Sequence, residues 1–238
     1  MSTILAIETS SELASCALLV GDRVLARSSA GVRTHSQSVL PMVQELLREA
    51  GIALQDCDAI AFGAGPGSFT GVRTACGVAQ GLAFGANRPV LPLVTLAAMA
   101  EGCRTRTGAI EVLAVLDARM GEVYWAQYRY DTVRGAWIEV SAPALSAPQD
   151  VMPVPAAGLA ACGNGFSAYP EAFAGKEFAN GALDDILPHA RDLAVLGASA
   201  FTDGQGLPAA QAQPLYLRNK VAYTSAERQA INAAKAGA

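Results

Sequence analysis

The chain has 238 residues, enough for one large domain or two of ordinary size, and 52% of them are hydrophobic. Only 16% are charged, so the composition excludes a disordered protein. The formal net charge of -4 argues against a chain that holds nucleic acid over a broad surface, because that binding depends on Lys and Arg neutralising phosphates. No apolar run reaches the roughly 18 residues that a membrane span needs.

The five cysteines are widely spaced, and no C-x-x-C pair supports a zinc site. Buried, reduced thiols of a cytosolic protein are the natural interpretation, and we expect a cytoplasmic location. The first residues carry no basic region before their apolar run, so we expect a first strand here and not a signal peptide.

The first hundred residues predict three strands, a helix, a strand, a helix and a strand. The expected strands are 4–7, 14–20 and 23–28, with Gly21 and Asp22 as a hairpin turn. A helix over 34–50 follows, with Pro41 in a first turn capped by Ser38. Strand 58–62, a helix over 72–85 and strand 89–93 complete this unit.

The glycine-rich stretch 63–85 joins the last two of these strands. Gly63, Gly65, Gly67 and Gly71 form a loop in which the backbone can approach a ligand or another element, and Ser68 or Thr70 can cap the helix. The spacing is neither G-x-G-x-x-G nor a Walker loop. Gly77, Gly81 and Gly85 then share one helix face. Phosphate contact, docking of a partner helix and close packing inside the chain's own fold all stay open, and residue types alone favour the last.

The second half resembles a looser copy of the first. Strands are expected at 111–116, 122–130, 136–140 and 159–162, and a helix at 189–202. The pattern predicts an α/β protein with a duplicated, actin-like (ASKHA, ribonuclease H-like) fold of two βββαβαβ-type halves, the second degenerate, with a cleft between them. We divide it into 1–104 and 105–213. The segment 214–238, whose net charge is +3 from Arg218, Lys220, Arg228, Lys235 and Glu227, can pack back on the first half.

Polar residues at the ends of corresponding strands suggest a nucleotide cleft. Glu8, Thr9 and Ser10 end the first strand, and Asp117 ends the matching strand of the second half. The Gly163 to Gly165 loop completes this set. The alternatives are a solvated Glu8 and a local ion pair between Asp117 and Arg119. The two histidines, His35 and His189, lie far apart in the sequence and form no H-E-x-x-H motif, so no catalytic and no metal-binding residue is predicted.

Motifs spread over nearly the whole chain resemble the TsaB family, also called YeaZ. They are residues 4–11, 35–42, 65–73, 117–119 with 122–124, 162–165 and 214–218. The resemblance implies an actin-like duplicated fold and a bacterial protein required to make threonylcarbamoyladenosine in tRNA, at the adenosine next to the anticodon of tRNAs that read codons starting with A. In that family the chemistry resides in a paralogue, TsaD, and the ATPase TsaE joins them.

One departure from TsaD can be located in this sequence. The resemblance places Thr95 and Met99 where TsaD has two metal-binding histidines, and neither residue is a plausible ligand for such a metal. It therefore implies a scaffold or activator that is not itself an enzyme.

We expect this chain to bind a TsaD-like partner through the helices 34–50 and 72–85. The expected interface residues are His35, Val39, Met42, Val43, Leu46, Val72, Arg73, Cys76, Gly77, Gln80, Gly81 and Phe84. Alone, the chain is expected to form a homodimer, and tRNA is reached only through the complex. No cofactor is required by this chain, although ATP or ADP can bind at the complex interface. The alternatives are an independent actin-like ATPase or small-molecule kinase and, more distantly, a metallopeptidase.

Overall fold

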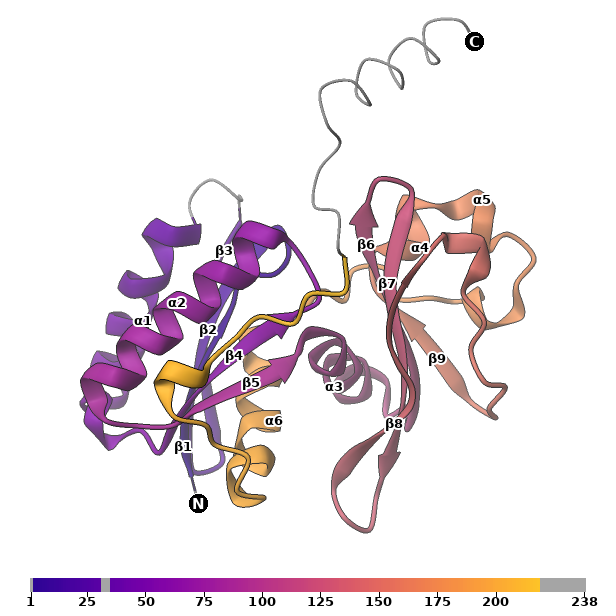
Figure 1. The fold of residues 1–238 in the computed structure, drawn as a ribbon. Coiled ribbons are helices and arrows are strands. Elements are labelled where there is room, and N and C mark those ends of the chain that lie inside the picture. Colours follow the sequence, from indigo (N-terminus) through magenta and orange to yellow (C-terminus); the bar gives the residue numbers. More distant parts are fainter. Residues whose placement is uncertain (1, 31–34, 219–238) are drawn as a thin grey trace, which may run out of the picture.

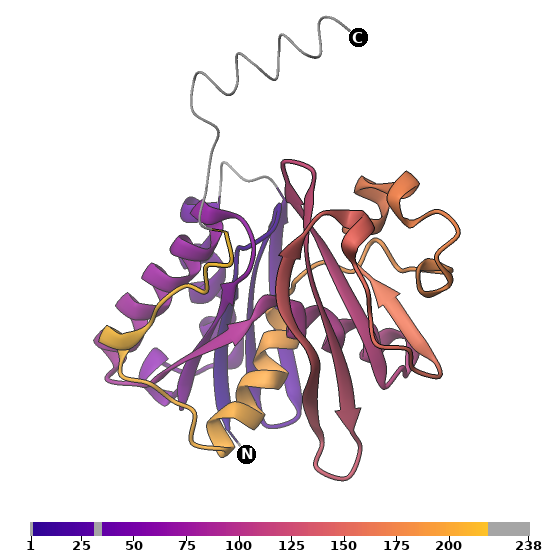
Figure 2. The same ribbon diagram turned by 45° about the vertical axis from the view of Figure 1, so that its right-hand side comes forward.

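The computed structural model of the protein describes residues 2–30 and 35–218. These residues form two lobes that stand side by side, each built on one mixed β-sheet (Figures 1 and 2). The first sheet has the strand order β3-β2-β1-β4-β5, and the second has the order β8-β7-β6-β9. None of the described helices is long and apolar enough to cross a membrane.

The first sheet comprises β1 (Thr3–Glu8), β2 (Leu13–Val20), β3 (Arg23–Ala30), β4 (Ala59–Gly65) and β5 (Val90–Val94). The strands β1, β2 and β3 pair antiparallel, whereas β4 is parallel to both β1 and β5. The helices α1 (His35–Ala50) and α2 (Phe69–Ala86) cover one face, and α6 (Ala190–Thr202) covers the other. The predicted order of three strands, helix, strand, helix and strand is confirmed for this lobe.

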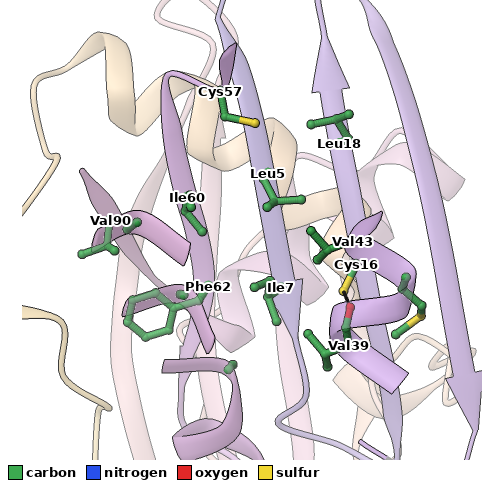
Figure 3. Packing of buried hydrophobic residues seen from close by; sticks show 14 of the residues in the cluster. Leu5, Ile7, Cys16, Leu18, Val39, Val43, Cys57, Ile60, Phe62 and Val90 are labelled. Carbon is green, nitrogen blue, oxygen red and sulfur yellow. Dashed lines mark hydrogen bonds between the residues drawn. The ribbon is translucent and has the colours of Figure 1, made fainter. Parts of the chain in front are cut away.

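Alternation along the strands decides which side chains each layer receives. Leu5 and Ile7 of β1 pack with Ile60 and Phe62 of β4 in the layer under α1 and α2, as Figure 3 shows. The intervening residues of β1, Ile4 and Ala6, face α6. A strand directs neighbouring residues to opposite faces, and helices cover both faces of this sheet. Its central strands β1 and β4 are therefore buried and apolar over most of their length.

The second sheet comprises β6 (Glu111–Arg119), β7 (Glu122–Asp131), β8 (Ala136–Ser146) and β9 (Leu159–Cys162). One face is covered by α3 (Thr95–Thr107), and the other by the short helices α4 (Gly165–Ala168) and α5 (Pro170–Phe173). This face has irregular cover and lacks a long helix among its described residues, in agreement with the expected degeneracy of the second half.

The predicted division of the chain is wrong at the junction of the lobes. The boundary at 104/105 falls inside α3, a helix that the sequence pattern did not predict. This helix follows β5 of the first sheet but packs on the second, with Leu96 and Met99 in the second-lobe core. Conversely, α6 follows the second-lobe elements but packs on the first sheet. Each lobe therefore receives a helix from the chain segment assigned to the other.

The helix boundaries also test the predicted caps. Ser68 caps α2 as expected, because its hydroxyl accepts a hydrogen bond from the Gly71 N–H at 3.3 Å. For α1 the prediction is wrong, since the helix already begins at His35 and Pro41 lies inside it. The Ser38 hydroxyl instead donates to the His35 carbonyl oxygen at 3.4 Å.

Residues 207–218, which we name the C-terminal strap, run from the first lobe to the second (the yellow segment in Figure 1). Leu207 pairs with Val90 at the edge of the first sheet, and the Leu215 N–H donates to the Ala64 carbonyl oxygen at 2.7 Å. Arg218 then contacts Glu122 of the second lobe. Within the segment 214–238, which we expect to pack on the first half, Leu215 contacts the first lobe and Arg218 the second, and 219–238 lie outside the described residues.

Candidate functional site

A cleft of about 490 Å³ lies between the two lobes. Its first-lobe wall is formed by the loop after β1 and the loop before α2, and its second-lobe wall by the end of β6 and the loop after β9. The strap residues 215–218 line it as well. The cleft thus collects the carboxyl ends of β1 and β6, which is where ligands bind in open α/β sheets.

The acidic residue predicted to face this cleft lies beneath it. Glu8 is completely buried, and its Oε1 accepts a hydrogen bond from the Ser10 N–H at 2.5 Å. Burial raises the pKa of the Glu8 carboxyl, and Oε2 has no hydrogen-bond partner among the described residues. Thr9 is also buried, and its hydroxyl donates to the Gly71 carbonyl oxygen at 2.7 Å. Of these predicted cleft residues, only Ser10 lines the cavity, so the prediction that Glu8 and Thr9 face a ligand is corrected.

The glycine loop packs directly on this end of β1. An ideal Cβ on Gly63 would lie 1.9 Å from Glu8 Oε2, and one on Gly71 would lie 1.9 Å from the Thr9 carbonyl oxygen. The Ser68 N–H donates to the Ser10 carbonyl oxygen at 2.7 Å, so this loop amide is already engaged. Of the three interpretations of the loop, close packing within the fold is the one that the contacts support.

The matching strand end in the second lobe is also held by local contacts. Asp117 lines the cleft, and its carboxylate accepts hydrogen bonds from the Tyr169 hydroxyl at 3.0 Å and the Arg119 N–H at 2.8 Å. Its Oδ2 also lies 3.0 Å from Arg119 Nη1. This is the local ion pair that the sequence left open as the alternative.

The glycines of the predicted loop, Gly163 and Gly165, pack on the same strand and do not line the cavity. An ideal Cβ on Gly163 would lie 2.2 Å from the Val115 carbonyl oxygen. Asn164 between them does reach the cleft, where its Oδ1 accepts from the Asp117 N–H at 2.9 Å. The glycines therefore serve close packing, and the polar contact comes from the residue between them.

Sequence reasoning did not assign a site role to the charged residues that line the rest of the cleft. Arg119 Nη2 lies 3.7 Å from Glu12 Oε2, so this pair bridges the two lobes. Arg218 reaches Glu122 Oε2 at 2.5 Å and the Arg119 carbonyl oxygen at 3.2 Å. The sequence feature that could have indicated a site role for Arg218 is its place in the 214–218 motif. No local pattern, however, indicates that the strap returns to the cleft.

We expect the change Arg218→Ala to lower the free energy of unfolding by about 1–3 kcal/mol, because the largely buried guanidinium ties the strap to Glu122. The control is Arg134→Ala, whose 3.8 Å contact with Asp131 is formed by an arginine that is 81% exposed. That change should stay within about 0.5 kcal/mol. Urea unfolding of both variants measures the difference, and equal effects would contradict a role of Arg218 as a tie between the lobes.

The predicted partner-interface residues fall into three groups, which are buried, half-buried and exposed. Several are buried in the chain's own first-lobe core, so their side chains stabilise the lobe and are not available for direct contact with a partner: His35, Val39, Met42, Val43, Leu46, Val72 and Cys76. Gln80 is half-buried and donates hydrogen bonds to the carbonyl oxygens of Ala209 and Ala212 in the strap. The exposed members are Arg73, Gly77, Gly81 and Phe84.

These exposed residues mark one open face of α2. Among residues 2–30 and 35–218, ideal Cβ atoms on Gly77, Gly81 and Gly85 meet no atom within 4 Å, and the Phe84 side chain is 84% exposed. Close packing within this described part of the chain therefore does not explain the glycine stripe, in contrast to the loop glycines. We name Gly77, Gly81, Phe84 and Gly85 the α2 face.

The positions compared with the metal-binding histidines lie in the core. Thr95 begins α3 and Met99 follows one turn later, and both are completely buried. Within residues 2–30 and 35–218, no group of three His, Cys, Asp or Glu side chains is arranged to hold a metal ion. The histidines have local roles: His35 Nε2 lies 3.2 Å from the Glu12 carbonyl oxygen, and His189 caps α6.

The protein has two lobes, each with a mixed sheet, and a cleft at the strand ends lies between them. The helices α3 and α6 each pack on the lobe opposite to their neighbours in the chain. These features define an actin-like α/β protein. Residues 24–224 match a family model described as TsaD: tRNA N6-adenosine threonylcarbamoyltransferase. Relatives named tRNA threonylcarbamoyladenosine biosynthesis protein TsaB include those of Escherichia coli K12 and Haemophilus influenzae. The first is 42% identical over 92% of this chain and 96% of its own length, and the second 37% identical over 93% and 95%. The chain belongs to the TsaB family.

Solved structures agree with this assignment. The structure of YeaZ from Pseudomonas aeruginosa has a TM-score of 0.83 and 44% identity, and the match covers 91% of this chain and 100% of that chain. A second structure from the same organism, described as an uncharacterized protein with similarity to peptidase YEAZ, has a TM-score of 0.84 and 45% identity.

Proposed function

We propose that this chain is a non-catalytic scaffold or activator subunit in the biosynthesis of tRNA threonylcarbamoyladenosine, and that it acts by binding a TsaD-like catalytic paralogue. The relatives' shared name supports the pathway. The observation that carries the scaffold role is the open α2 face, where glycines with free space around them adjoin an exposed Phe84. Glycines on a helix surface allow another helix to approach closely, and an exposed aromatic side chain is a frequent anchor at protein interfaces.

The chemistry of the cleft supports a role without catalysis. Glu8 is buried under Gly63, and the arginines Arg119 and Arg218 are paired with carboxylates. Thr95 and Met99 stand at the positions compared with the metal ligands of TsaD, and a thioether and a hydroxyl are poor ligands for such a metal. These residues stabilise the fold around the cleft and leave transfer of the threonylcarbamoyl group to the partner.

In the proposed assembly the ATPase TsaE joins the two paralogues in the cytoplasm. ATP or ADP binds at an interface of the complex and not as a cofactor of this chain. The tRNA substrate, a tRNA that reads codons starting with A, is bound through the complex, in keeping with the net charge of -4 on this chain. Alone, the chain pairs with a second copy through the same α2 face.

The variant Gly81→Leu tests the proposed interface. Because an added Cβ meets none of the described residues within 4 Å, the folded monomer should tolerate leucine, and a better helix former should keep or raise its thermal midpoint. In the bound state the same side chain should collide with the partner. We expect co-purification with the cell's own TsaD-like protein and self-association in sedimentation both to be lost.

A matched control places leucine on a different exposed helix surface. Ser199→Leu adds comparable apolar bulk on α6, which covers the opposite side of the first sheet. This variant should retain co-purification with the TsaD-like protein. If Gly81→Leu also retains it, the interface lies elsewhere and the proposal fails.

Turnover of ATP by the purified chain alone separates this function from the kinase alternative. We expect negligible turnover because Asp117 in the cleft wall is engaged by Arg119 and Tyr169, and because Glu8 is buried beneath the cleft. A steady rate above about 0.1 s⁻¹, two decades below that of a typical enzyme, would favour an independent ATPase. Loss of that rate in Asp117→Asn would locate it in the cleft and exclude a contaminating enzyme.

A further inference from the structure

An arginine lies against two aromatic rings at the N-terminal end of the α2 face. Arg73 precedes Gly77 by one helical turn, so Arg73, Gly77 and Gly81 lie in one row along the helix. The guanidinium carbon of Arg73 is 3.7 Å from the centre of the Phe69 ring and 5.6 Å from that of the Tyr216 ring. The Arg73 Nε–H also donates to the Tyr216 hydroxyl at 2.7 Å. The helix and the C-terminal strap therefore hold this side chain together.

These contacts fix the direction of the guanidinium without neutralising its charge. Among the residues that the structure describes, Arg73 donates a hydrogen bond only through Nε, so the N–H groups of Nη1 and Nη2 can donate to another molecule. No carboxylate of residues 2–30 and 35–218 forms an ion pair with Arg73, whereas Arg119 and Arg218 of the cleft are both paired. Arg73 is therefore a preorganised positive charge on an exposed part of α2.

A molecule that covers the α2 face has to supply an acceptor for this arginine. Covering the face removes water from the guanidinium, and a desolvated charge without a partner weakens association. The two oxygens of a carboxylate match the two N–H groups that a guanidinium presents side by side, and such charged hydrogen bonds are stronger than neutral ones. An Asp or Glu side chain on the docking surface meets this requirement.

A second copy of the chain does not offer a free carboxylate at the same face. A symmetric pair of copies buries the same surface on both, and Arg73 is the only charged residue of α2. The strap residues 207–218 contain no Asp or Glu. On α1, which lies beside α2 (Figure 1), Glu45 and Glu49 are already paired with Arg27 of β3. Self-pairing through the α2 face therefore desolvates Arg73 without neutralising it.

We infer that Arg73 selects the partner at the α2 face, because it pairs with an Asp or Glu side chain on the docking helix of the TsaD-like protein and disfavours a second copy. This inference rests on the proposed function, in which the TsaD-like protein binds this face. Specificity is a difference between two affinities, and the arginine changes both of them in opposite directions. Gly77 and Gly81 allow a helix to approach closely, and Arg73 determines which helix is preferred.

The variant Arg73→Met tests this selection, because methionine keeps an apolar contact with Phe69 and lacks the charge. The purified TsaD-like protein should bind this variant at least about tenfold more weakly than the wild type, since loss of one member of a buried charge pair costs more than that factor. Self-association, measured by sedimentation equilibrium, should be unchanged or stronger. The thermal midpoint of the variant verifies that the chain is folded.

The variant Arg73→Glu separates the effect of charge from that of packing. A glutamate that faces the partner's carboxylate adds repulsion, so the TsaD-like protein should bind this variant more weakly than Arg73→Met. The control is Arg191→Met, which removes an exposed arginine from α6 on the opposite side of the first sheet and should bind as the wild type does. Each affinity is measured without nucleotide and again with ATP or ADP.

Three results would overturn the selection by Arg73. They are unchanged binding of the TsaD-like protein by Arg73→Met, equal weakening of that binding and of self-association, and an effect that appears only with ATP or ADP, which would make a phosphate the acceptor. The variant Gly81→Leu distinguishes these failures from failure of the proposed function. If Gly81→Leu retains the TsaD-like protein, the proposed interface is wrong. If it loses that protein while Arg73→Met retains it, only the selection by Arg73 fails.

Discussion

Replacement of Gly71 by alanine is expected to lower the free energy of unfolding by about 3 kcal/mol or more. An ideal Cβ at this position lies 1.9 Å from the carbonyl oxygen of Thr9 and 2.9 Å from its carbonyl carbon. These are backbone atoms of the segment that ends β1, so no side-chain rotation relieves the clash. The Thr9 hydroxyl also donates to the Gly71 carbonyl oxygen at 2.7 Å, and a shift that makes room for the methyl group would lengthen this bond.

The same helix contains the matched control. Gly77→Ala introduces an identical methyl group in α2, but there an ideal Cβ meets no atom of the part of the chain that the structure describes within 4 Å. The change should stabilise the chain by about 0.5–1 kcal/mol through helix propensity and the lower entropy of the unfolded chain. Urea unfolding of the two variants should give shifts of opposite sign. Shifts of the same sign would show that the packing of the loop on β1 is not what selects Gly71.

The strands were predictable because their apolar runs are local signals. The runs at 4–7, 111–116 and 159–162 lie inside or coincide with β1, β6 and β9, and each is bounded by turn residues or a change to polar residues. The duplicated, actin-like architecture followed from the repeat of three strands in each half. Local pattern therefore predicts where most strands lie along the chain, whereas the order of the strands within each sheet comes from the structure.

Helix α3 was missed because it has no polar stripe. Its buried residues include Thr95, Met99, Glu101 and Cys103, which point in several directions around the axis, since the helix packs both on the second sheet and on α6. A helix buried on most sides lacks the 3.6-residue alternation by which an amphipathic helix is recognised. The exchange of α3 and α6 between lobes is likewise a tertiary arrangement that neither helix encodes locally.

The alternation of side chains along β1 explains why Glu8 is not a cleft residue. Alternate residues of a strand point to the same face of the sheet, so Glu8 points to the same face as Ile4 and Ala6, and α6 covers that face. The carboxyl group is therefore directed into the protein, over the space left by Gly63. The position at a strand end was predicted from the sequence, but the direction of the side chain depends on which face the helices cover.

The interface prediction illustrates a related limit. Helical spacing selected apolar residues such as Val39 and Met42, and these face the core because an amphipathic helix turns its apolar stripe inward. The exposed α2 face was predicted from its glycines. Glycines allow a partner helix to approach closely whether or not the helix has an apolar periodicity. Whether that face binds the partner stays a prediction, which Gly81→Leu tests.

Asp192 is a second buried carboxyl group, and it lies where the exchanged helices α3 and α6 meet. It occupies the first turn of α6 and is 9% exposed, and its Oδ2 lies 3.1 Å from the site of an ideal Cβ on Gly102 of α3. Burial, followed by the nearby carboxylate of Glu101 on α3, raises the pKa of Asp192 to about 7. Arg191 on the same helix opposes this shift but does not cancel it.

The change Asp192→Asn should therefore stabilise the protein above neutral pH. The folded pKa exceeds the ordinary value of 3.8, so between about pH 4 and about pH 7 the folded chain binds the extra proton, and stability falls as the pH rises through this window. The loss of stability is on the order of 4 kcal/mol for a pKa shift of this size, and asparagine, which stays neutral, avoids it.

The free energy of unfolding, measured at about pH 5 and about pH 8, should differ less between the two pH values in the variant than in the wild type. Asp203→Asn, at the exposed far end of α6, is the control and should retain the wild-type difference. An unchanged difference in Asp192→Asn would show that Asp192 does not ionise in this window.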